Sequence, residues 1–368
     1  MAEARARSQF PDHLAGELEA LGQDLLVGGK AATAMVGACR ATWRRASVGR
    51  FPFIFAAVLL ARRGRAKEAS ALLEHAAGNT FAGVLRRYLV KTGRLGVPSR
   101  RRDSADTLNV WTSTALSEKE MVATVRAFTG LLSGADASPV GSVPAILDIG
   151  TGNGILICRF INRLISAYRL KDLHLILLDR SEAMLREALL NCQRLVRLRL
   201  RVSTIHCPIE SLSERQIVRL GKENLWFATA ASCLHHLPRD LKVTTLATVR
   251  RLASLVLLEE LEGNHDLPDR DSLELVWSVQ RFYGALIRSV LRTNVSQAQQ
   301  EGCIDQFLLA EAMRILTRAK SRRGDHHTSR GEWCSVAREA GFASVEGLAT
   351  ELGSHGPCCL TFRLRAEI

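Results

Sequence analysis

The feature that most constrains the fold is a glycine loop set between an apolar run and a helical stretch. The run at 145–150 reads AILDIG, and the loop at 148–154 reads DIGTGNG. Glycines there let the backbone turn sharply and approach a ligand without interference from a Cβ atom. The dinucleotide-binding pattern needs Gly or Ala where Ile155 stands, and the Gly-Lys-Ser/Thr of a phosphate loop is absent. The loop is therefore not built for a pyrophosphate.

Apolar runs of strand length alternate with helical stretches after the loop. The runs lie at 145–150, 174–179, 200–206, 225–231 and 255–260, and helical stretches at 182–196, 211–221 and 239–252 lie among them. Alternation of this kind predicts βαβ crossovers and a parallel sheet. We therefore expect a doubly wound α/β fold, followed by long helices near 271–291 and 301–319, a helix at 330–340 and an antiparallel pair of edge strands.

The chain before the loop is helical in character. Apolar residues recur at three- and four-residue spacing over residues 12–92, which predicts four or five short helices. Gly- and Pro-containing stretches at 93–110 and 133–144 resemble linkers around a helix at 117–132. We therefore divide the chain into an N-terminal helical cap at 1–110 and a larger domain at 111–368, with a helical insertion at about 268–325.

The charge of the chain is +13 and is unevenly distributed. Residues 1–110 hold 18 Lys/Arg and 9 Asp/Glu, an excess of nine positive charges. Such a module can attract nucleic acid, but aromatic residues make up only 5% of the chain. Single-stranded nucleic acid is usually bound through stacking on aromatic side chains. A solvated, arginine-rich helical surface is therefore preferred, and nucleic acid is disfavoured as a partner.

The cysteines and the hydropathy of the chain indicate in which cellular compartment the protein is expected. The nine cysteines are an odd number, form no C-x-x-C motif and have no zinc-ligand spacing. No secretory signal is recognisable at the N-terminus, so free thiols indicate a reducing, cytoplasmic location. The most apolar run, at 51–61, is about 11 residues long, whereas a membrane span needs ~20. No membrane partner is expected.

Polar residues follow the second and fourth expected strands. Asp179 ends the second, where a carboxylate can accept both hydroxyls of a ribose. The fourth leads into ASCLHHLP at 231–238, which places small residues and a histidine pair at the edge where open α/β sheets bind ligands. Adjacent histidines can bind metal, but no carboxylate pattern completes a site, so no metal is expected.

Together, DIGTGNG, Asp179 and SCLHHLP resemble class I S-adenosylmethionine-dependent methyltransferases, which have a Rossmann-like sheet. In that family the glycine loop holds the methionine end, the acid of strand two takes the ribose, and a residue after strand three flanks the adenine. Pro208 stands where an acid is common, so Ile209 and Glu210 are the candidates for the adenine contact. The resemblance implies S-adenosylmethionine as cofactor, bound by Asp148, Gly150, Thr151, Gly152, Gly154, Asp179, Arg180, Ile209, Glu210 and Ser232.

The C-terminal part narrows the resemblance. From strand five the chain reads ELEGNHD at 260–266, and then come Tyr283, His326-His327, Trp333 and a Gly-Phe pair at 341–342. This succession resembles the GRAS domain family, in which plant members are transcriptional regulators and bacterial members look like active methyltransferases. The glycine loop, often degraded in plant members, is intact here. The C-terminal end that contains Trp in plant members is absent.

Several polar residues qualify for an acceptor pocket at the end of strand five. We expect substrate contacts from Glu260, Glu262, Asn264, His265, Tyr283 and His236, and a general base in His265 with His327 in reserve. Histidine suits this task because its unperturbed pKa lies near neutral pH. Tyr283 lies in a helical stretch with regularly spaced apolar residues, so packing in the core explains its presence as well as a substrate contact does.

The expected function is methylation of a small organic molecule, with oxygen preferred over nitrogen as the acceptor atom. A non-catalytic binding or regulatory protein of the GRAS type is the first alternative, and an RNA or protein methyltransferase is the second. A homodimer is compatible with the sequence. The cap and the insertion are expected to close over the pocket and exclude water.

Overall fold

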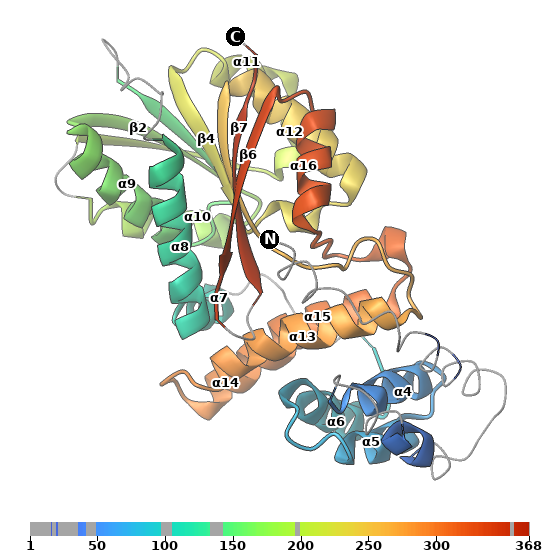
Figure 1. Ribbon diagram of the computed structural model, residues 1–368. Helices are drawn as coiled ribbons and strands as arrows, with labels where there is room; N and C mark the ends of the chain where they lie inside the picture. Colours follow the sequence, from blue (N-terminus) through green and yellow to red (C-terminus); the bar gives the residue numbers. More distant parts are fainter. Residues whose placement is uncertain are drawn as a thin grey trace. The chain divides into compact units, whose positions relative to one another are not determined.

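The computed structural model describes residues 16, 20, 36–41, 49–96, 105–132, 143–195, 199–353 and 357–367. The chain forms two compact units (Figure 1). One comprises 1–100 and 263–325, and the other comprises 101–262 and 326–368. The structure thus groups the insertion with the N-terminal helices, and not with the domain at 111–368 to which the sequence analysis assigned it.

The second unit, hereafter the α/β unit, is built on a seven-stranded sheet of order β3-β2-β1-β4-β5-β7-β6. The strands are β1 (Ala145–Ile149), β2 (Asp172–Asp179), β3 (Arg199–His206), β4 (Leu225–Ala231), β5 (Leu255–Leu261), β6 (Ser344–Glu351) and β7 (Cys358–Arg365). Strands β1 to β5 pair in parallel, and β7 runs antiparallel to both β5 and β6. The doubly wound α/β fold and the antiparallel C-terminal pair are therefore confirmed.

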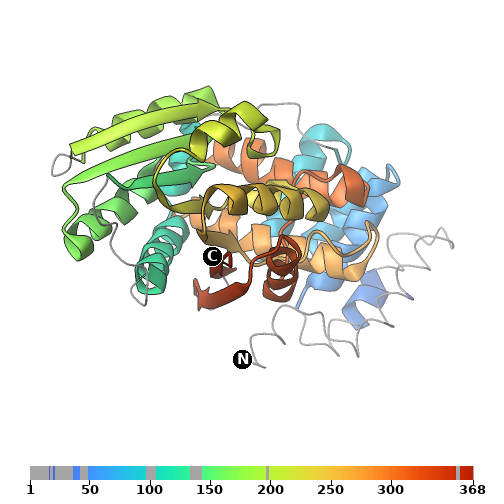
Figure 2. The same cartoon turned by 90° about the horizontal axis from the view of Figure 1, so that it is seen from above.

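Helices cover both faces of this sheet (Figure 2). They are α8 (Ala115–Leu132), α9 (Ile155–Tyr168), α10 (Glu182–Cys192), α11 (Glu214–Leu220), α12 (Arg239–Leu252) and α16 (Arg330–Glu339). The unit also contains α7 (Ala105–Thr112), which contacts α8 and α10, and the 3-10 turns η1 (Ile209–Ser211) and η2 (Leu234–His236). Apolar side chains of α8, α9 and α10 pack on one face, and those of α11, α12 and α16 pack on the other. Helix α7 occupies the end of the segment that the sequence analysis assigned to a linker.

Local sequence explains where several of these helices begin. The side chain of Ser181 accepts a hydrogen bond from the backbone of Met184 at the start of α10. Ser213 and Gln216 form a capping box at α11, and Pro238 directly precedes α12. The side chains of Ser181 and Ser213 satisfy backbone N–H groups that a helix leaves without partners in its first turn, whereas Pro238 makes no such bond.

Strand order creates a switch point between β1 and β4. From β1 the chain proceeds to β2 and β3 on one side of the sheet, and it then returns to β4 and β5 on the other side. In open α/β sheets the crevice outside the carboxyl ends of the strands at such a point binds ligands. The glycine loop follows β1 and Ser232 follows β4, so both flank this crevice.

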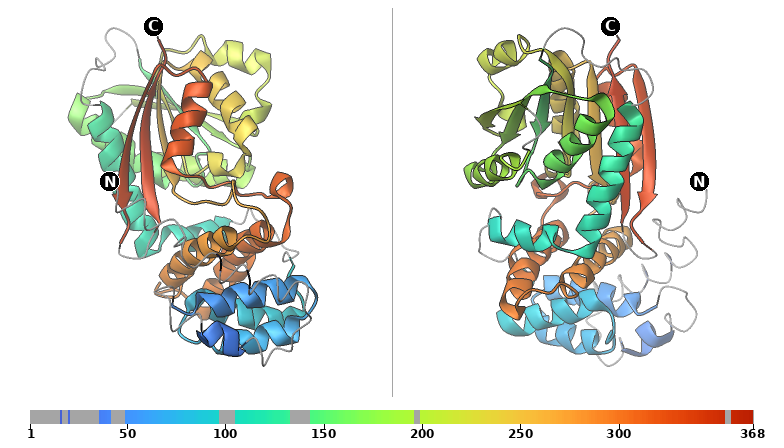
Figure 3. Two further views of the ribbon diagram at one scale, coloured as in Figure 1. Left: turned by 45° about the vertical axis from the view of Figure 1, so that its right-hand side comes forward. Right: turned by 90° about the vertical axis from the view of Figure 1, so that its left-hand side faces the viewer.

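The first unit is helical (Figure 3). It contains α4 (Phe51–Arg62), α5 (Ala66–Glu74), α6 (Thr80–Thr92), α13 (Leu273–Val290), α14 (Gln297–Cys303), a π-helical turn η3 (Ile304–Leu308), α15 (Leu309–Thr317) and a 3-10 turn η4 (Lys320–Arg322). Helix α13 packs on α4 and α6, with the rings of Phe51 and Trp277 in edge contact at 4.9 Å. The helix expected at 301–319 instead starts at Gln297, after a Ser296–Gln299 capping box, and is interrupted by η3.

Two expectations concern the N-terminal segment. Residues 16, 20 and 36–41 are helical, and the rest of the segment before residue 49, where further helical residues are expected, lies outside the described residues. Helix α4 is buried from Phe51 to Ala61. Among the helices described, none has the length and apolarity that a membrane crossing requires.

Candidate functional site

The glycine loop lies at the carboxyl edge of the sheet. Gly150, Gly152 and Gly154 have positive φ angles of 65°, 53° and 75°. A Cβ atom on Gly150 would lie 2.4 Å from Cβ of Cys233, and one on Gly154 would lie 2.8 Å from Cα of Ala188. Both separations are too short for a real Cβ atom, so the backbone passes through a space that only glycine fits.

Asp148 holds the loop from inside the sheet. Its Oδ1 accepts a 2.6 Å hydrogen bond from Thr229, and its Oδ2 accepts one of 2.6 Å from Thr151. Burial raises the pKa of Asp148 to about 6, although both hydroxyl groups oppose this effect. Since both carboxylate oxygens are engaged by the protein, Asp148 positions the loop and Thr151 within it.

Asp179 contacts the glycine loop directly. Its Oδ2 accepts a 2.9 Å hydrogen bond from the N–H of Gly152, and its Oδ1 accepts one of 2.8 Å from the N–H of Ser181. The loop and the acid of strand two, 27 residues apart in sequence, thus meet at one point. Arg180 beside them is exposed.

The candidates for the adenine contact lie in η1, directly after β3. Ile209 is buried in the apolar core on the α11 and α12 face, whereas Glu210 is exposed. Their assignment to the adenine remains a prediction.

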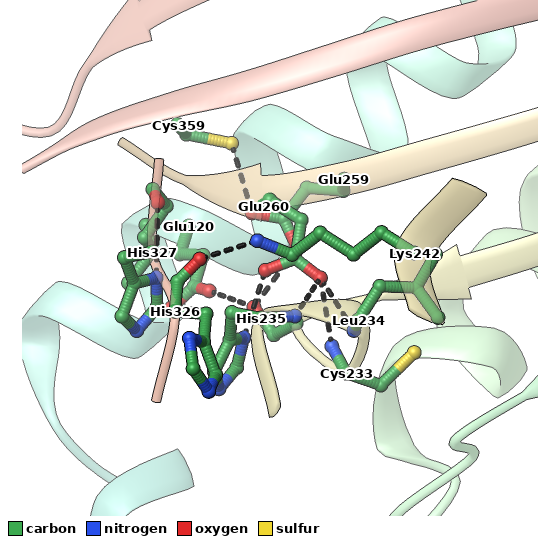
Figure 4. Close-up of polar contacts among 12 residues, drawn as sticks. Glu120, Cys233, Leu234, His235, Lys242, Glu259, Glu260, His326, His327 and Cys359 are labelled. Atoms are coloured by element: carbon green, nitrogen blue, oxygen red, sulfur yellow. Dashed lines mark hydrogen bonds and ion pairs between the residues drawn. The ribbon is translucent and has the colours of Figure 1, made fainter. Parts of the chain in front are cut away.

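Glu260 organises the segment that follows β4 (Figure 4). Its Oε1 accepts hydrogen bonds from the N–H groups of Cys233, Leu234 and His235 at 3.1, 2.7 and 3.1 Å. Its Oε2 lies 2.8 Å from Nδ1 of His235. Burial raises the pKa of Glu260, while nearby His327 and Lys242 oppose that effect. The carboxylate therefore shapes the turn that faces Gly150.

A second cluster, of a serine and two glutamates, was not predicted from the sequence. Oγ of Ser232 lies 2.8 Å from Oε1 of Glu120 on α8 and 3.0 Å from Oε2 of Glu259. One hydroxyl hydrogen can serve only one carboxylate at a time, so the contact with the other carboxyl group is favourable when that group is protonated and donates to Oγ. Burial raises the pKa of Glu120 to about 7. Burial also raises the pKa of Glu259 well above its ordinary value, and the nearby charges of Glu120 and Glu260 raise it further.

Glu120 and Glu259 are functional candidates that sequence reasoning missed. In the sequence, Glu120 is one of several charges on an amphipathic helix and Glu259 is one of two acids that end a strand. Successive strand residues point to opposite faces, so Glu259 reaches Glu120 while Glu260 reaches η2. The only local signal was a pair of acids inside an otherwise apolar strand.

The histidines gather on the other side of Glu260. The rings of His235 and His327 stack at 4.1 Å, and Nδ1 of His327 lies 3.1 Å from the carbonyl oxygen of Leu261. A carbonyl only accepts, so Nδ1 of His327 carries the hydrogen and Nε2 is the basic nitrogen. Lys242 is fully buried and donates to the carbonyl of His326.

Ligand atoms of His235, Glu260 and His327 lie within 4.8 Å of one another, a spacing that can hold a metal ion. The buried ammonium group of Lys242 supplies positive charge beside Glu260. A cation bound there would be repelled by this charge, so the arrangement is a poor metal site. The absence of a metal remains a prediction.

The residues expected on the acceptor side are divided between the units. Glu262, with Glu260, His236 and His327, belongs to the α/β unit, where its Oε1 accepts from the N–H of Arg330 at 3.1 Å. The helical unit holds Asn264, His265 and Tyr283.

Within the helical unit His265 is a buried aromatic neighbour. It is fully buried, 5.0 Å from the ring of Phe282 and 5.8 Å from that of Tyr283. The hydroxyl group of Tyr283 donates to Glu311 at 3.5 Å. The structure therefore brings together the glycine loop, Asp179, Ser232, Glu260 and His327, and it places His265 in a different unit.

Comparison with solved structures connects this architecture to a known fold. The crystal structure of SCL7 of Oryza sativa, a GRAS protein, matches with a TM-score of 0.58 and 13% identity, over 91% of this chain and 100% of that one. The chain has the fold of SCL7. The resemblance to the GRAS family drawn from the C-terminal motifs is thereby confirmed at the level of the fold.

Two methyltransferase structures match less closely. A Burkholderia thailandensis 1,6-didemethyltoxoflavin-N1-methyltransferase has 18% identity and a TM-score of 0.40, over 78% of this chain and 89% of that one. Magnesium protoporphyrin IX methyltransferase of Synechocystis has 14% identity and a TM-score of 0.40, over 68% and 86%. No protein-family profile and no curated protein matches the sequence.

Proposed function

We propose that the protein is an S-adenosylmethionine-dependent methyltransferase that acts on a small organic molecule, with an oxygen atom as the preferred acceptor. The observation that carries the proposal is the contact between Asp179 and the glycine loop at the switch point of the sheet. Glycine is required at both ends of that loop because a Cβ atom would meet Cys233 or Ala188, and a backbone without side chains can approach a ligand closely.

The chain's own groups would bind and orient the cofactor, which supplies an electrophilic methyl group. Asp179 would release the N–H of Gly152 and accept the ribose hydroxyls, leaving that N–H to donate to the ligand. Asp148 would keep the loop in place through Thr151 and Thr229. Displacement at a methyl group is mainly a problem of holding the two partners close and in line, so a preformed loop supplies much of what the reaction needs.

A hydroxyl acceptor also has to lose a proton. His265 and His327 remain the bases proposed from the sequence, and Nε2 is the basic nitrogen of His327. The structure adds Glu120, whose pKa is raised to about 7 by burial and which contacts Ser232 at the end of β4. A carboxylate with a pKa near neutral pH suits general-base work.

The experiment compares cofactor affinity between variants at the two ends of β2. Asp179→Ala should weaken S-adenosylmethionine binding by about 1.5–3 kcal/mol, the range for a hydrogen bond to a charged group, or roughly 10–150-fold. Asp172→Ala is the matched control because Asp172 begins the same strand and pairs with the exposed Arg199. Calorimetry should show unchanged affinity in the control, and unchanged affinity in Asp179→Ala would refute the site.

The fold match with SCL7 favours one alternative, a binding protein of the GRAS type without turnover. That alternative predicts saturable cofactor binding with no transfer of a labelled methyl group to any acceptor in a mixed small-molecule pool. The methyltransferase predicts transfer, with a loss in Asp179→Ala that Asp172→Ala does not share.

A further inference from the structure

A second group of polar side chains lies away from the glycine loop, on β2, β3 and the segment after α11. Nε2 of His174 lies 2.9 Å from Oγ of Ser203, and Nδ1 of His174 lies 3.0 Å from Oε2 of Glu223. A hydroxyl, an imidazole and a carboxylate in this order form the arrangement that activates a serine nucleophile in hydrolases of unrelated folds. The arrangement is recognised by geometry and not by sequence position.

The group borders a cavity. The cavity has a volume of about 220 Å³, and His174, Ser203, Thr204 and Glu223 are among the residues that line it. All three residues line the cavity; His174 is buried, and Ser203 and Glu223 are half-buried. The volume suits a short acyl group.

We propose that Ser203, His174 and Glu223 form a second catalytic site, which hydrolyses short-chain carboxylic esters independently of methyl transfer. The site also has a candidate donor for a developing oxyanion. The N–H groups of Arg199 and Cys207 donate to the β2 side, so alternation along the strand directs the N–H of Thr204 to the opposite edge of β3. Among the described strands, none pairs with that edge.

The protonation of His174 decides whether it can act as a base. Burial lowers the pKa of His174, and the hydrogen bond with Glu223 opposes this effect, so the ring is neutral at neutral pH. Glu223 accepts only, which favours the tautomer with the hydrogen on Nδ1, and in this tautomer Nε2 can take the serine proton. Arg201 contacts both Nδ1 and Glu223 and only donates, so it favours the opposite tautomer, in which Nδ1 accepts and Nε2 carries the hydrogen. The proposed reaction requires the tautomer that Glu223 favours.

The chemical step balances with water as the only co-reactant. Oγ of Ser203 bonds to the ester carbonyl carbon while its proton passes to Nε2 of His174. The bond between that carbon and the alkoxy oxygen then breaks, and Nε2 returns the proton to the leaving alcohol. Water cleaves the acyl-serine by the same route, giving a carboxylic acid and the original hydroxyl group.

The test treats the full chain with a fluorophosphonate probe and follows the adduct by intact mass and peptide mapping. We expect one adduct, on Ser203, and hydrolysis of p-nitrophenyl acetate. Both should be lost in Ser203→Ala and slowed ~10²–10⁴-fold in His174→Gln, the range for general-base help. Ser166→Ala, at an exposed serine of α9, is the matched control and should react like the wild type.

Two further variants exclude trivial explanations. Arg201→Ala should label at least as fast as the wild type, because it removes the competitor for Nδ1. If Ser203→Ala fails to fold, Ser203→Cys retains a nucleophile, and its alkylation by iodoacetamide should slow when His174 is replaced. Absence of an adduct on Ser203, or equal labelling in His174→Gln, would show that the three residues are only a hydrogen-bonded group in the fold.

Discussion

Replacing Glu120 by glutamine should change how the stability of the α/β unit depends on pH. A carboxyl group whose pKa rises from 4.5 to about 7 on folding costs about 3 kcal/mol to keep ionised in the folded state. Because the folded pKa is the higher one, this group favours the folded state below pH 4.5. That advantage is lost as the pH rises towards 7, where the unfolded chain has already released the proton.

Glu120→Gln removes the titration and keeps the geometry. The amide nitrogen can donate to Oγ of Ser232, whose hydroxyl hydrogen is then free to donate to Glu259. The gain of the variant over the wild type should be below about 1 kcal/mol near pH 5 and reach about 3 kcal/mol near pH 8.5. Urea unfolding at both pH values measures the difference.

Glu118→Gln is the control on the same helix. Glu118 is exposed and pairs with Arg159, an arrangement that lowers the pKa of Glu118 through the hydrogen bond. Its replacement should cost about 0–1 kcal/mol and bring no gain at alkaline pH. A constant difference between Glu120→Gln and the wild type at pH 5 and pH 8.5 would refute the raised pKa of Glu120.

Three other variants test the site. Gly154→Ala should lower the unfolding free energy by more than ~1 kcal/mol in thermal unfolding, because its φ is 75° and its Cβ meets Ala188, whereas Gly302→Ala, with open space around it, should not. Glu260→Ala should lower the unfolding free energy by about 3–5 kcal/mol in urea, because it leaves the buried charge of Lys242 without its partner and three N–H groups without their acceptor. A loss below about 1 kcal/mol would contradict this. His265→Ala should reduce turnover ~10²–10⁴-fold with unchanged cofactor affinity in calorimetry if His265 is the base, and unchanged turnover would assign that role elsewhere.

The strands were predictable because their signals are local. The runs at 145–150 and 225–231 correspond to β1 and β4, since a strand buried on both faces is continuously apolar. The glycine loop and Asp179 were predictable because the carboxyl ends of parallel strands lie at one edge of the sheet.

Features that depend on distant pairing were not predictable. Nothing in the sequence at 263–325 shows that its apolar faces pack on the N-terminal helices, because amphipathicity does not name a partner. The role of Glu120 depends on a contact across 112 residues, and that of Ser203 depends on His174 and Glu223 from two other segments. In each case the residue type is common, and its chemical role depends on which residues contact it in the folded chain.

Titration of S-adenosylhomocysteine into the full chain by calorimetry tests the central claim most directly. The methyltransferase account predicts saturable binding with one site per chain, competition by S-adenosylmethionine, and weakening in Asp179→Ala but not in Asp172→Ala. Absence of binding at millimolar ligand by the folded protein would contradict it.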